Sequence, residues 1–301
     1  MLQLFCKSYG EKMKNDKTLL YQITETSRYM MSFVIVTREN NAIVIDGGRP
    51  LDMPLLKEHI GGRHIKAWIF THAHEDHISG IVDELTQNGG ADFDVECFYY
   101  NFPPYSLIEK KNETKDPEYF EVELNEMLPA FAEVEPLIRD RSHIVEQGET
   151  IDIDECHIEF LYTFHDGLYS NVINDSSLVF KLTAPNKTVL FLGDLGPDGG
   201  DFLFRESRHK LKSDIVQMAH HGHMNVGLEV YAEIRPETCL WCCPEWLYEE
   251  PELPDYLSRT EKHFRDGRMR MYGTGMTRRW MELLGVKSHY VTKDGTNVIE
   301  I

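Results

Sequence analysis

Three histidines and one aspartate stand in the order H-x-H-x-D-H over the six residues from His72 to His77. Imidazole nitrogen and carboxylate oxygen are ligands that zinc and similar divalent ions accept. Residues two apart on a strand point to the same side, so His72 and His74 could bind one ion together. Asp76 and His77 follow where the chain turns into a predicted helix, which would direct them to a second ion. The run therefore predicts a metal centre.

The segments on either side of this run indicate how it is positioned. Residues 65–70 are apolar and aromatic, which is typical of a buried strand, and a helix is expected from Ile78 to Leu85. With 301 residues and 42% hydrophobic content, the chain can bury a sizeable core. Alternating strands and helices favour one α/β domain over residues 1–301. Further strands are predicted at 18–24, 32–37, 41–45, 94–101, 143–145, 149–153, 157–162, 177–182 and 188–192, helices at 54–60, 226–234 and 256–264, and a terminal hairpin over 289–301.

Two later strands also end in metal-binding residue types. Asp194 follows five apolar residues, where a carboxylate could bridge two ions or, alternatively, cap a turn before Gly196. His220 and His221 follow the apolar segment that begins at Ile215. Adjacent side chains on a strand point to opposite sides, so one of the pair should bind metal directly. We expect His220 to be that ligand and His221 to orient a ligand or donate to substrate, although the assignment could be reversed.

These pieces together resemble the metallo-β-lactamase superfamily. The resemblance rests on the H-x-H-x-D-H run, on the strand that ends in Asp46-Gly47-Gly48, on the Gly193-Asp194 strand end and on the double histidine before Gly222. It implies an α/β fold of four layers, an αββα sandwich of two mixed β-sheets. The stretch from Asn174 to Phe180 and the double histidine are similar to the metallo-hydrolase domain of competence DNA-uptake proteins, the ComEC-like branch.

The resemblance also implies roles for individual residues. Asp194 would bridge two divalent ions, with zinc expected and manganese as the alternative, and Asp46 would support the site through hydrogen bonds. The expected metal ligands are His72, His74, Asp76, His77, Asp194 and His220. The third protein ligand of the first ion stays open between His165, Asn174 and Asp175. An amide oxygen there would suit manganese better than zinc.

The chemistry that follows is metal-dependent hydrolysis by a hydroxide bound at a dinuclear centre. Asp76 and His221 are the expected catalytic residues, Asp76 as a proton acceptor. We expect a phosphodiester substrate, either nucleic acid or a small diester such as a nucleotide ester. Scattered basic residues near the C-terminus fit that choice: His263, Arg265, Arg268, Arg270, Arg278 and Arg279. A carboxylic ester, thioester or lactone hydrolase is the alternative, and a non-catalytic metal-binding sensor is the second alternative.

The net charge and the composition limit the binding partners and the cellular location that can be expected. A net charge of −19 opposes sequence-independent binding to long duplex DNA, but paired cations could make the pocket locally positive. No segment is long and apolar enough for a membrane helix, and the start lacks a secretory signal, so a cytoplasmic protein is expected. Cys239, Cys242 and Cys243 indicate a buried strand with reduced thiols rather than a zinc site. The acidic insertion at about 101–140 is expected to carry an amphipathic helix that covers the sheet or forms a lid.

Overall fold

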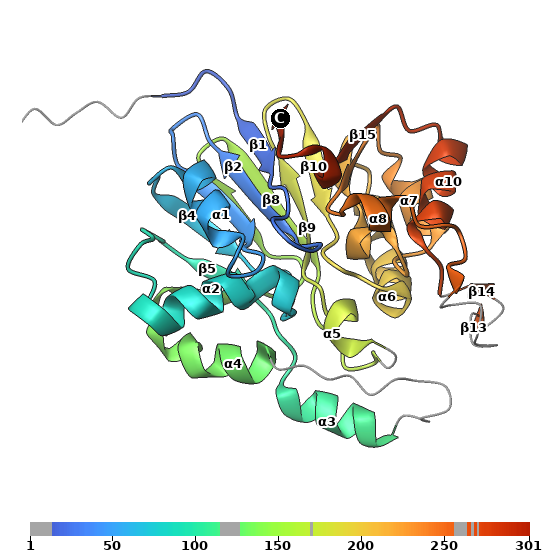
Figure 1. The fold of residues 1–301 in the computed structure, drawn as a ribbon, viewed down its shortest axis with the longest axis horizontal. Helices are drawn as coiled ribbons and strands as arrows, with labels where there is room; N and C mark the ends of the chain where they lie inside the picture. Colours follow the sequence, from blue (N-terminus) through green and yellow to red (C-terminus); the bar gives the residue numbers. More distant parts are fainter. Residues whose placement is uncertain (1–13, 115–126, 169–170, 256–263, 266–267, 270) are drawn as a thin grey trace, which may run out of the picture.

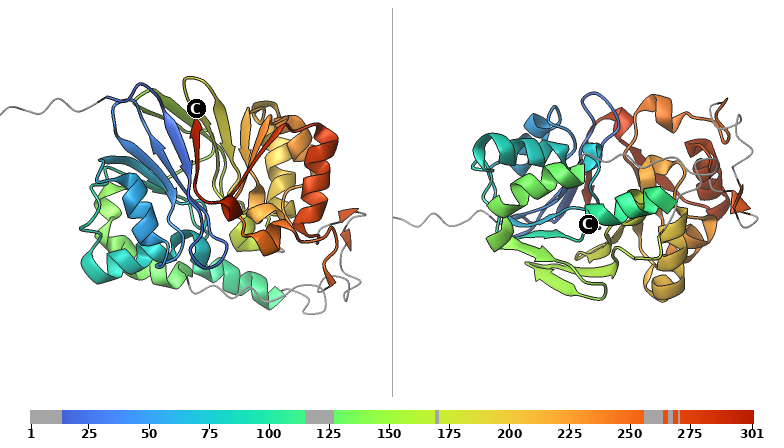
Figure 2. Two further views of the ribbon diagram at one scale, coloured as in Figure 1. Left: turned by 45° about the horizontal axis from the view of Figure 1, so that its top comes forward. Right: turned by 90° about the horizontal axis from the view of Figure 1, so that it is seen from below.

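Two seven-stranded sheets pack face to face, and helices cover both outer faces (Figure 1). The computed structural model describes residues 14–114, 127–168, 171–255, 264–265, 268–269 and 271–301. Figure 2 shows the layers from two further sides. The predicted four-layer αββα sandwich is confirmed.

The first sheet has the strand order β16-β1-β2-β3-β4-β5-β6. Strands β1 to β3 are antiparallel neighbours, whereas β3 to β6 run parallel. The central strands β2 and β3 are buried along their whole length, as expected for strands covered on both faces. The bounds are β1 Leu19–Gln22, β2 Ser32–Val36, β3 Ala42–Asp46, β4 Ile65–Ile69, β5 Phe98–Tyr100, β6 Ser142–Ile144 and β16 Asn297–Glu300.

The second sheet has the order β15-β12-β11-β10-β9-β8-β7. Strands β7 to β10 are antiparallel, and β10, β11, β12 and β15 are parallel. The bounds are β7 Thr150–Ile153, β8 Cys156–Tyr162, β9 Val179–Thr183, β10 Thr188–Phe191, β11 Ile215–Gln217, β12 Thr238–Trp241 and β15 Ser288–Val291. A separate two-stranded ribbon joins β13 Phe264–Arg265 to β14 Arg268–Met269.

The core is divided among the three interfaces between the layers. Between the sheets, Phe33 meets Phe191 edge to face with ring centroids 5.2 Å apart, and Phe191 stacks on Phe180. Each fully buried ring of this kind contributes about 1.5–3 kcal/mol to folding. Helices α1 Met53–Ile60, α2 Glu75–Asn88 and α4 Met127–Val134 cover the first sheet, and α6 Pro197–Ser207, α7 Leu228–Ile234 and α10 Thr274–Leu284 cover the second.

The acidic insertion contains two described helices, α3 Tyr105–Thr114 and α4. In α4 the buried residues are Leu128, Phe131 and Val134, which join the core beneath the first sheet. This part of the insertion therefore covers the sheet. Residues 115–126 of the insertion lie outside the described residues, and a lid role for the rest of the insertion stays a prediction.

Two predicted elements differ from the structure or lie outside its described residues. The expected terminal hairpin is wrong: β15 pairs with β12 in the second sheet, whereas β16 pairs with β1 in the first. The short helix Thr292–Asp294 and Gly295, with φ of 105°, carry the chain from one sheet to the other. The helix predicted at 256–264 lies outside the described residues except for Phe264, which is in β13.

Two composition-based expectations can be compared with the described residues. None of the helices among them is both long and apolar enough to cross a membrane. Cys239, Cys242 and Cys243 are buried free thiols at and just after β12, as expected. Burial raises the pKa of each of the three, so they stay protonated.

Candidate metal centre

The candidate centre lies where the ends of strands from both sheets meet. Strand β4 ends at Ile69, and the chain then runs extended to α2, so that Asp76 and His77 occupy the first turn of that helix. Asp194 follows β10 at the end of the second sheet. His221 follows β11, the parallel neighbour of β10. Segments far apart in the sequence thus contribute to one site, and they do so at the strand ends where the sequence predicted metal-binding residue types.

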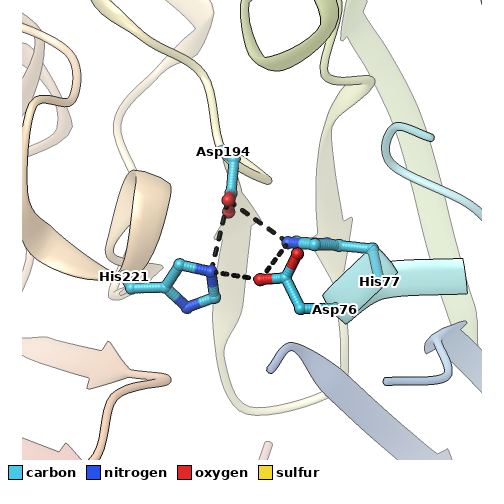
Figure 3. Close-up of side chains that lie close together, drawn as sticks. All are labelled: Asp76, His77, Asp194 and His221. Atoms are coloured by element: carbon cyan, nitrogen blue, oxygen red, sulfur yellow. Dashed lines mark hydrogen bonds and ion pairs between the residues drawn. The ribbon is translucent and has the colours of Figure 1, made fainter. Parts of the chain in front are cut away.

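Four buried side chains converge there: Asp76, His77, Asp194 and His221 (Figure 3). One ligand atom from each lies within 4.8 Å of all the others. Nε2 of His221 is 3.0 Å from Oδ2 of Asp76 and 3.2 Å from Oδ2 of Asp194. Nε2 of His77 is 3.3 Å from the same Asp194 oxygen and 3.8 Å from Oδ2 of Asp76. Two imidazoles and two carboxylates therefore face one small volume.

Hydrogen bonds on the far side of each ring fix the two imidazoles. Nδ1 of His77 lies 2.7 Å from Oδ2 of Asp46, and Nδ1 of His221 lies 2.7 Å from the carbonyl oxygen of Cys242. Both partners only accept, so each Nδ1 is the donor and each Nε2 is directed at the cluster. Asp46 also accepts from the backbone N–H and hydroxyl of Thr71. Asp46 therefore makes the kind of hydrogen bonds that the resemblance implied, and its role in metal binding stays a prediction.

The cluster couples its charges strongly. Burial alone would lower the pKa of His77, but the carboxylates of Asp194, Asp76 and Asp46 raise it to about 10. The pKa of His221 is likewise raised well above its usual value against the effect of burial, chiefly by Asp194. In return, the two imidazolium groups hold the pKa values of Asp76 and Asp194 below their usual range, although burial opposes this. Without metal, two protons balance the two carboxylates.

The hydrogen bonds within the cluster leave some of its buried ligand atoms without a partner, which a divalent cation could supply. Among the described residues, Nε2 of His77 and Oδ1 of Asp194 are buried polar atoms without a hydrogen-bond partner. Such atoms are costly unless a ligand or ion completes them. Neutral imidazole together with carboxylate is a donor set that zinc and related transition metals accept. The residues present therefore fit the metal that the fold implies.

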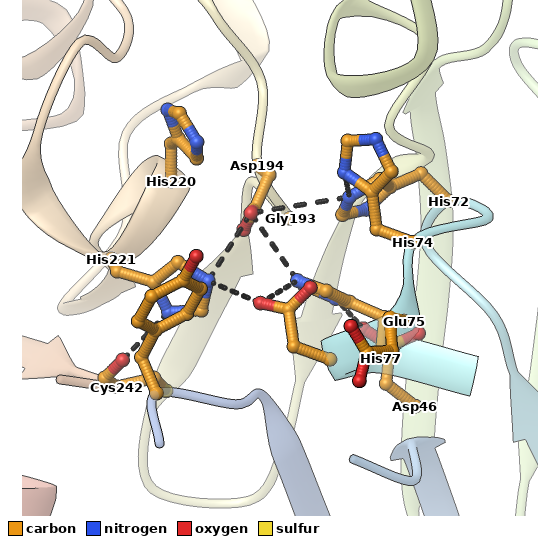
Figure 4. A network of polar contacts seen from close by, with 12 residues as sticks. Asp46, His72, His74, Glu75, His77, Gly193, Asp194, His220, His221 and Cys242 are labelled. Carbon is orange, nitrogen blue, oxygen red and sulfur yellow. Dashed lines mark hydrogen bonds and ion pairs between the residues drawn. The ribbon is translucent and has the colours of Figure 1, made fainter. Parts of the chain in front are cut away.

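His72 and His74 lie beside this cluster. Nε2 of His72 is 3.9 Å from Oδ2 of Asp194, and 3.1 Å from Nδ1 of His74. The His72 ring also packs at 4.0 Å from the His77 ring. Burial, followed by the nearby charge of His77, lowers the pKa of His72 well below its usual value, so its ring is neutral. Figure 4 shows the two histidines on the opposite side of Asp194 from His221.

The structure separates His220 from His221 in a way that strand alternation does not describe. Strand β11 ends at Gln217, and both histidines lie in a 3-10 turn, Ala219–Gly222, with left-handed φ values of 47° and 55°. That turn brings His221 into the cluster. His220, the expected ligand, instead places Nε2 3.2 Å from Nδ2 of Asn174, and its ring packs tilted against that of His223 with centroids 4.5 Å apart.

The three candidates for the third protein ligand of the first ion have different surroundings. His165 stacks on Phe202 at 3.9 Å and its Nδ1 accepts from the backbone N–H of Gly167, so its described contacts lie outside the cluster. Asp175 accepts a 2.8 Å hydrogen bond from the N–H of Gly199 in the first turn of α6. Asn174 keeps a buried Oδ1 without a hydrogen-bond partner in the described part of the chain. Asn174 also contacts a histidine beside the cluster, because its Nδ2 lies 3.2 Å from Nε2 of His220.

Tyr29 and Arg49 are neighbours of the cluster that the sequence reasoning missed. The Tyr29 ring lies 4.8 Å from the His221 ring, and burial together with the charge of Asp76 raises the pKa of its phenol. The Arg49 guanidinium lies over the Tyr29 ring at 5.4 Å. Neither residue stands in a recognisable motif. Only the position of Arg49 directly after the Asp46-Gly47-Gly48 turn could have drawn attention to it.

A sandwich of two mixed sheets, helices on both faces and a buried His/Asp cluster at the strand ends define the metallo-β-lactamase fold, which this chain has. Residues 30–89 match the model of the Metallo-beta-lactamase superfamily. This range contains both the turn after β3 and the H-x-H-x-D-H run. The match is to the superfamily and to no particular branch of it, so the narrower ComEC-like resemblance stays a prediction.

Solved structures extend the likeness beyond that range. The metallo-beta-lactamase fold protein YhfI from Bacillus subtilis is 12% identical, with a TM-score of 0.52 over 94% of this chain and 100% of that one. MEM-A1, a subclass B3 metallo-beta-lactamase from a soil metagenome library, is 15% identical, with a TM-score of 0.43 over 89% and 90%. A diphosphatase from the PhnP family is 13% identical, with a TM-score of 0.43 over 91% and 86%. At 12% identity, the likeness to YhfI shows the fold alone. No curated protein matches the chain in sequence.

Proposed function

We propose that this protein is a metal-dependent hydrolase that cleaves phosphodiesters. The observation that carries the hydrolase proposal is the buried convergence of Asp76, His77, Asp194 and His221 within 4.8 Å. Within it, Nε2 of His77 and Oδ1 of Asp194 have no hydrogen-bond partner among the described residues. A purely structural ion-pair network would leave fewer of its buried atoms unsatisfied.

The ligands divide around Asp194. We propose that Asp76, His77, Asp194 and His221 hold one ion, and that His72 and His74 hold a second ion together with Asp194. His221 thus takes the place first expected for His220. The free Oδ1 of Asn174, or His220 beside it, would complete the second set. Divalent ions bound there would make a water molecule acidic and would stabilise the charge that develops on the attacked ester.

The chain's own residues then have distinct tasks. Asp76 is ionised, because its pKa lies below the usual range, and its carboxylate is the group placed to accept a proton from the attacking water. Asp46 and the carbonyl of Cys242 keep the rings of His77 and His221 in one orientation. His74 and His220 are half-buried and lie on either side of Asp194 (Figure 4), so the substrate would enter between them.

The phosphodiester is the less strongly supported part of the proposal. It rests on the Asn174 to Phe180 stretch and the double histidine, which resemble the ComEC-like branch. The basic C-terminal residues add little, because Arg278 pairs with Glu249 at 3.8 Å and Arg279 with Glu252 at 3.1 Å. The net charge of −19 favours a small diester over long duplex DNA.

A paired assay tests the proposal. The protein is loaded with zinc or manganese, its metal content is measured, and bis-p-nitrophenyl phosphate is compared with p-nitrophenyl acetate as substrate. We expect bound metal and faster cleavage of the phosphodiester. Preference for the acyl ester would reject the substrate class and favour a carboxylic ester, thioester or lactone hydrolase. Bound metal without turnover of either compound would favour a sensor.

A further inference from the structure

One exposed tryptophan stands apart from its buried counterparts. Trp68 and Trp241 have no exposed surface, whereas Trp246 is 61% exposed. Trp246 lies in the short helix α8, Glu245–Tyr248, at the end of the second sheet that carries the metal centre. A single exposed apolar side chain needs no explanation by itself. Its position relative to the centre is what makes it informative.

A row of rings connects Trp246 to the buried cluster. The Trp246 ring lies 6.0 Å from the Tyr29 ring, and the Tyr29 ring lies 4.8 Å from the His221 ring. Exposure increases along the row: His221 is buried, Tyr29 is half-buried and Trp246 is exposed. The row therefore leads from the proposed ligands to the surface.

The middle ring of this row is held in place. Arg49 donates to the backbone carbonyl of Tyr29 and its guanidinium lies over the ring. Arg49 is itself fixed by Glu75, whose Oε1 is 3.2 Å from Nε. Glu75 precedes the ligand Asp76 at the start of α2, so the position of Tyr29 is tied to that of the centre. A surface that is fixed before a ligand arrives costs little ordering entropy on binding.

We propose that Trp246 and Tyr29 form the wall on which the protein binds a planar aromatic ring of its substrate, a nucleobase attached to the phosphodiester. This rests on the proposed function, because the ester must reach the cluster while its base lies on the wall. An aromatic face binds bases of any type by stacking. Such contacts would give an acidic protein affinity for a nucleotide ester without the basic surface that long nucleic acids need.

Two substrates that differ only by a base test the wall. They are the methyl ester of thymidine 5′-phosphate and the same ester of abasic deoxyribose 5-phosphate, with methanol release by the zinc-loaded protein as the measurement. We expect the natural chain to prefer the thymidine ester. Trp246→Ala should lower kcat/KM for the thymidine ester by about tenfold or more, the effect typical of losing one stacked base, and leave the abasic ester almost unchanged. Trp246→Phe should retain most of the preference.

Matched controls separate this inference from its alternatives. Leu283→Ala removes an exposed apolar side chain, 71% exposed on α10, and should change neither rate. An undiminished preference for the thymidine ester in Trp246→Ala would overturn the wall. So would a change in the elution volume of Trp246→Ala on a sizing column, because it would assign the tryptophan to a contact between protein chains.

A binding measurement keeps the inference independent of turnover. If the natural chain cleaves neither ester, the proposed phosphodiesterase function fails, while the wall is tested by fluorescence. Thymidine 5′-monophosphate should quench the tryptophan emission of the zinc-loaded protein, deoxyribose 5-phosphate should not, and the quenching should disappear in Trp246→Phe. Equal quenching in Trp246→Phe would show that the base binds elsewhere.

Discussion

The carboxylate of Asp46 accepts a 2.7 Å hydrogen bond from Nδ1 of His77, and neither side chain has any exposed surface. The two residues come from different elements, the end of β3 and the first turn of α2. The bond leaves Nε2 of His77 directed at Asp194, 3.3 Å away. A residue outside the ligand set thus determines which nitrogen of His77 is available to a metal.

Asp46→Asn should weaken metal binding without unfolding the protein. Asp46 has a left-handed φ of 52°, which asparagine tolerates, and an amide oxygen can still accept from Thr71. The amide no longer attracts the His77 ring as a carboxylate does. We expect zinc affinity to fall about 10–100-fold, measured by competition with a chromophoric chelator. Circular dichroism is the control for folding, and an unchanged affinity would refute the positioning role.

The two adjacent histidines give a direct comparison. His221→Ala should remove one metal equivalent and most activity, because its Nε2 lies 3.0–3.2 Å from two cluster carboxylates. His220→Ala should retain that equivalent, since the hydrogen-bond partners of its ring are Asn174 and the carbonyl of Met224 rather than the cluster carboxylates. Metal content by atomic emission, with the natural chain as reference, decides between them. The reverse result would return the ligand role to His220.

Asp194→Ala should abolish metal binding and hydrolysis together. This carboxylate contacts His77 and His221 on one side and approaches His72 on the other, so its loss affects both proposed ion positions. We expect activity to fall by more than about 100-fold, beyond the loss typical of supporting residues. Asp198→Ala, a nearby carboxylate in the first turn of α6, is the control. Activity that survived in Asp194→Ala would contradict the bridging role.

Metal removal should make stability depend on alkaline pH. In the metal-free protein the pKa of His77 is raised from 6.5 to about 10, so its charged form stabilises the fold fully below about pH 6.5. That stabilisation is lost as pH rises through 10, whereas the contribution of Asp76, whose pKa is depressed, is constant above about pH 4. The melting temperature of chelator-treated protein should therefore fall by several degrees between pH 7 and 10. A flat profile would show that His77 is already neutral at pH 7.

Gly222→Ala should damage the turn that presents His221. A Cβ at this position would lie 2.5 Å from Cζ3 of Trp241, and the residue has φ of 101°. We expect a loss of about 1–3 kcal/mol of stability, with lower metal content. Gly285→Ala is the matched control, because it also has positive φ, 72°, but no neighbouring atom within 4 Å, and it ends α10 away from the turn. Equal effects of the two changes on metal content would refute this account.

The sequence predicted the two strand ends that meet at the centre, and its resemblance to the superfamily implied the four layers. Local signals sufficed where they were dense: H-x-H-x-D-H follows an apolar strand, and Asp194 follows another. The predicted terminal hairpin was wrong because a turn sequence such as Asp294-Gly295 does not specify which strands it connects. The same residues can join two neighbouring strands of one sheet or lead from one sheet to the other. Which sheet a strand joins depends on the edge that is available, and that edge is made by residues far away in sequence.

Only the tertiary structure decided which donors share one volume. His220 and His221 are adjacent and chemically identical, and the left-handed turn between Ala219 and Gly222 determines that His221 contacts Asp76. Three separate segments of the chain contribute the row of rings from His221 through Tyr29 to Trp246. The spacing of these residues in the sequence therefore does not predict the row. Residue types determine which chemistry is possible, whereas long-range packing determines the distances on which that chemistry depends.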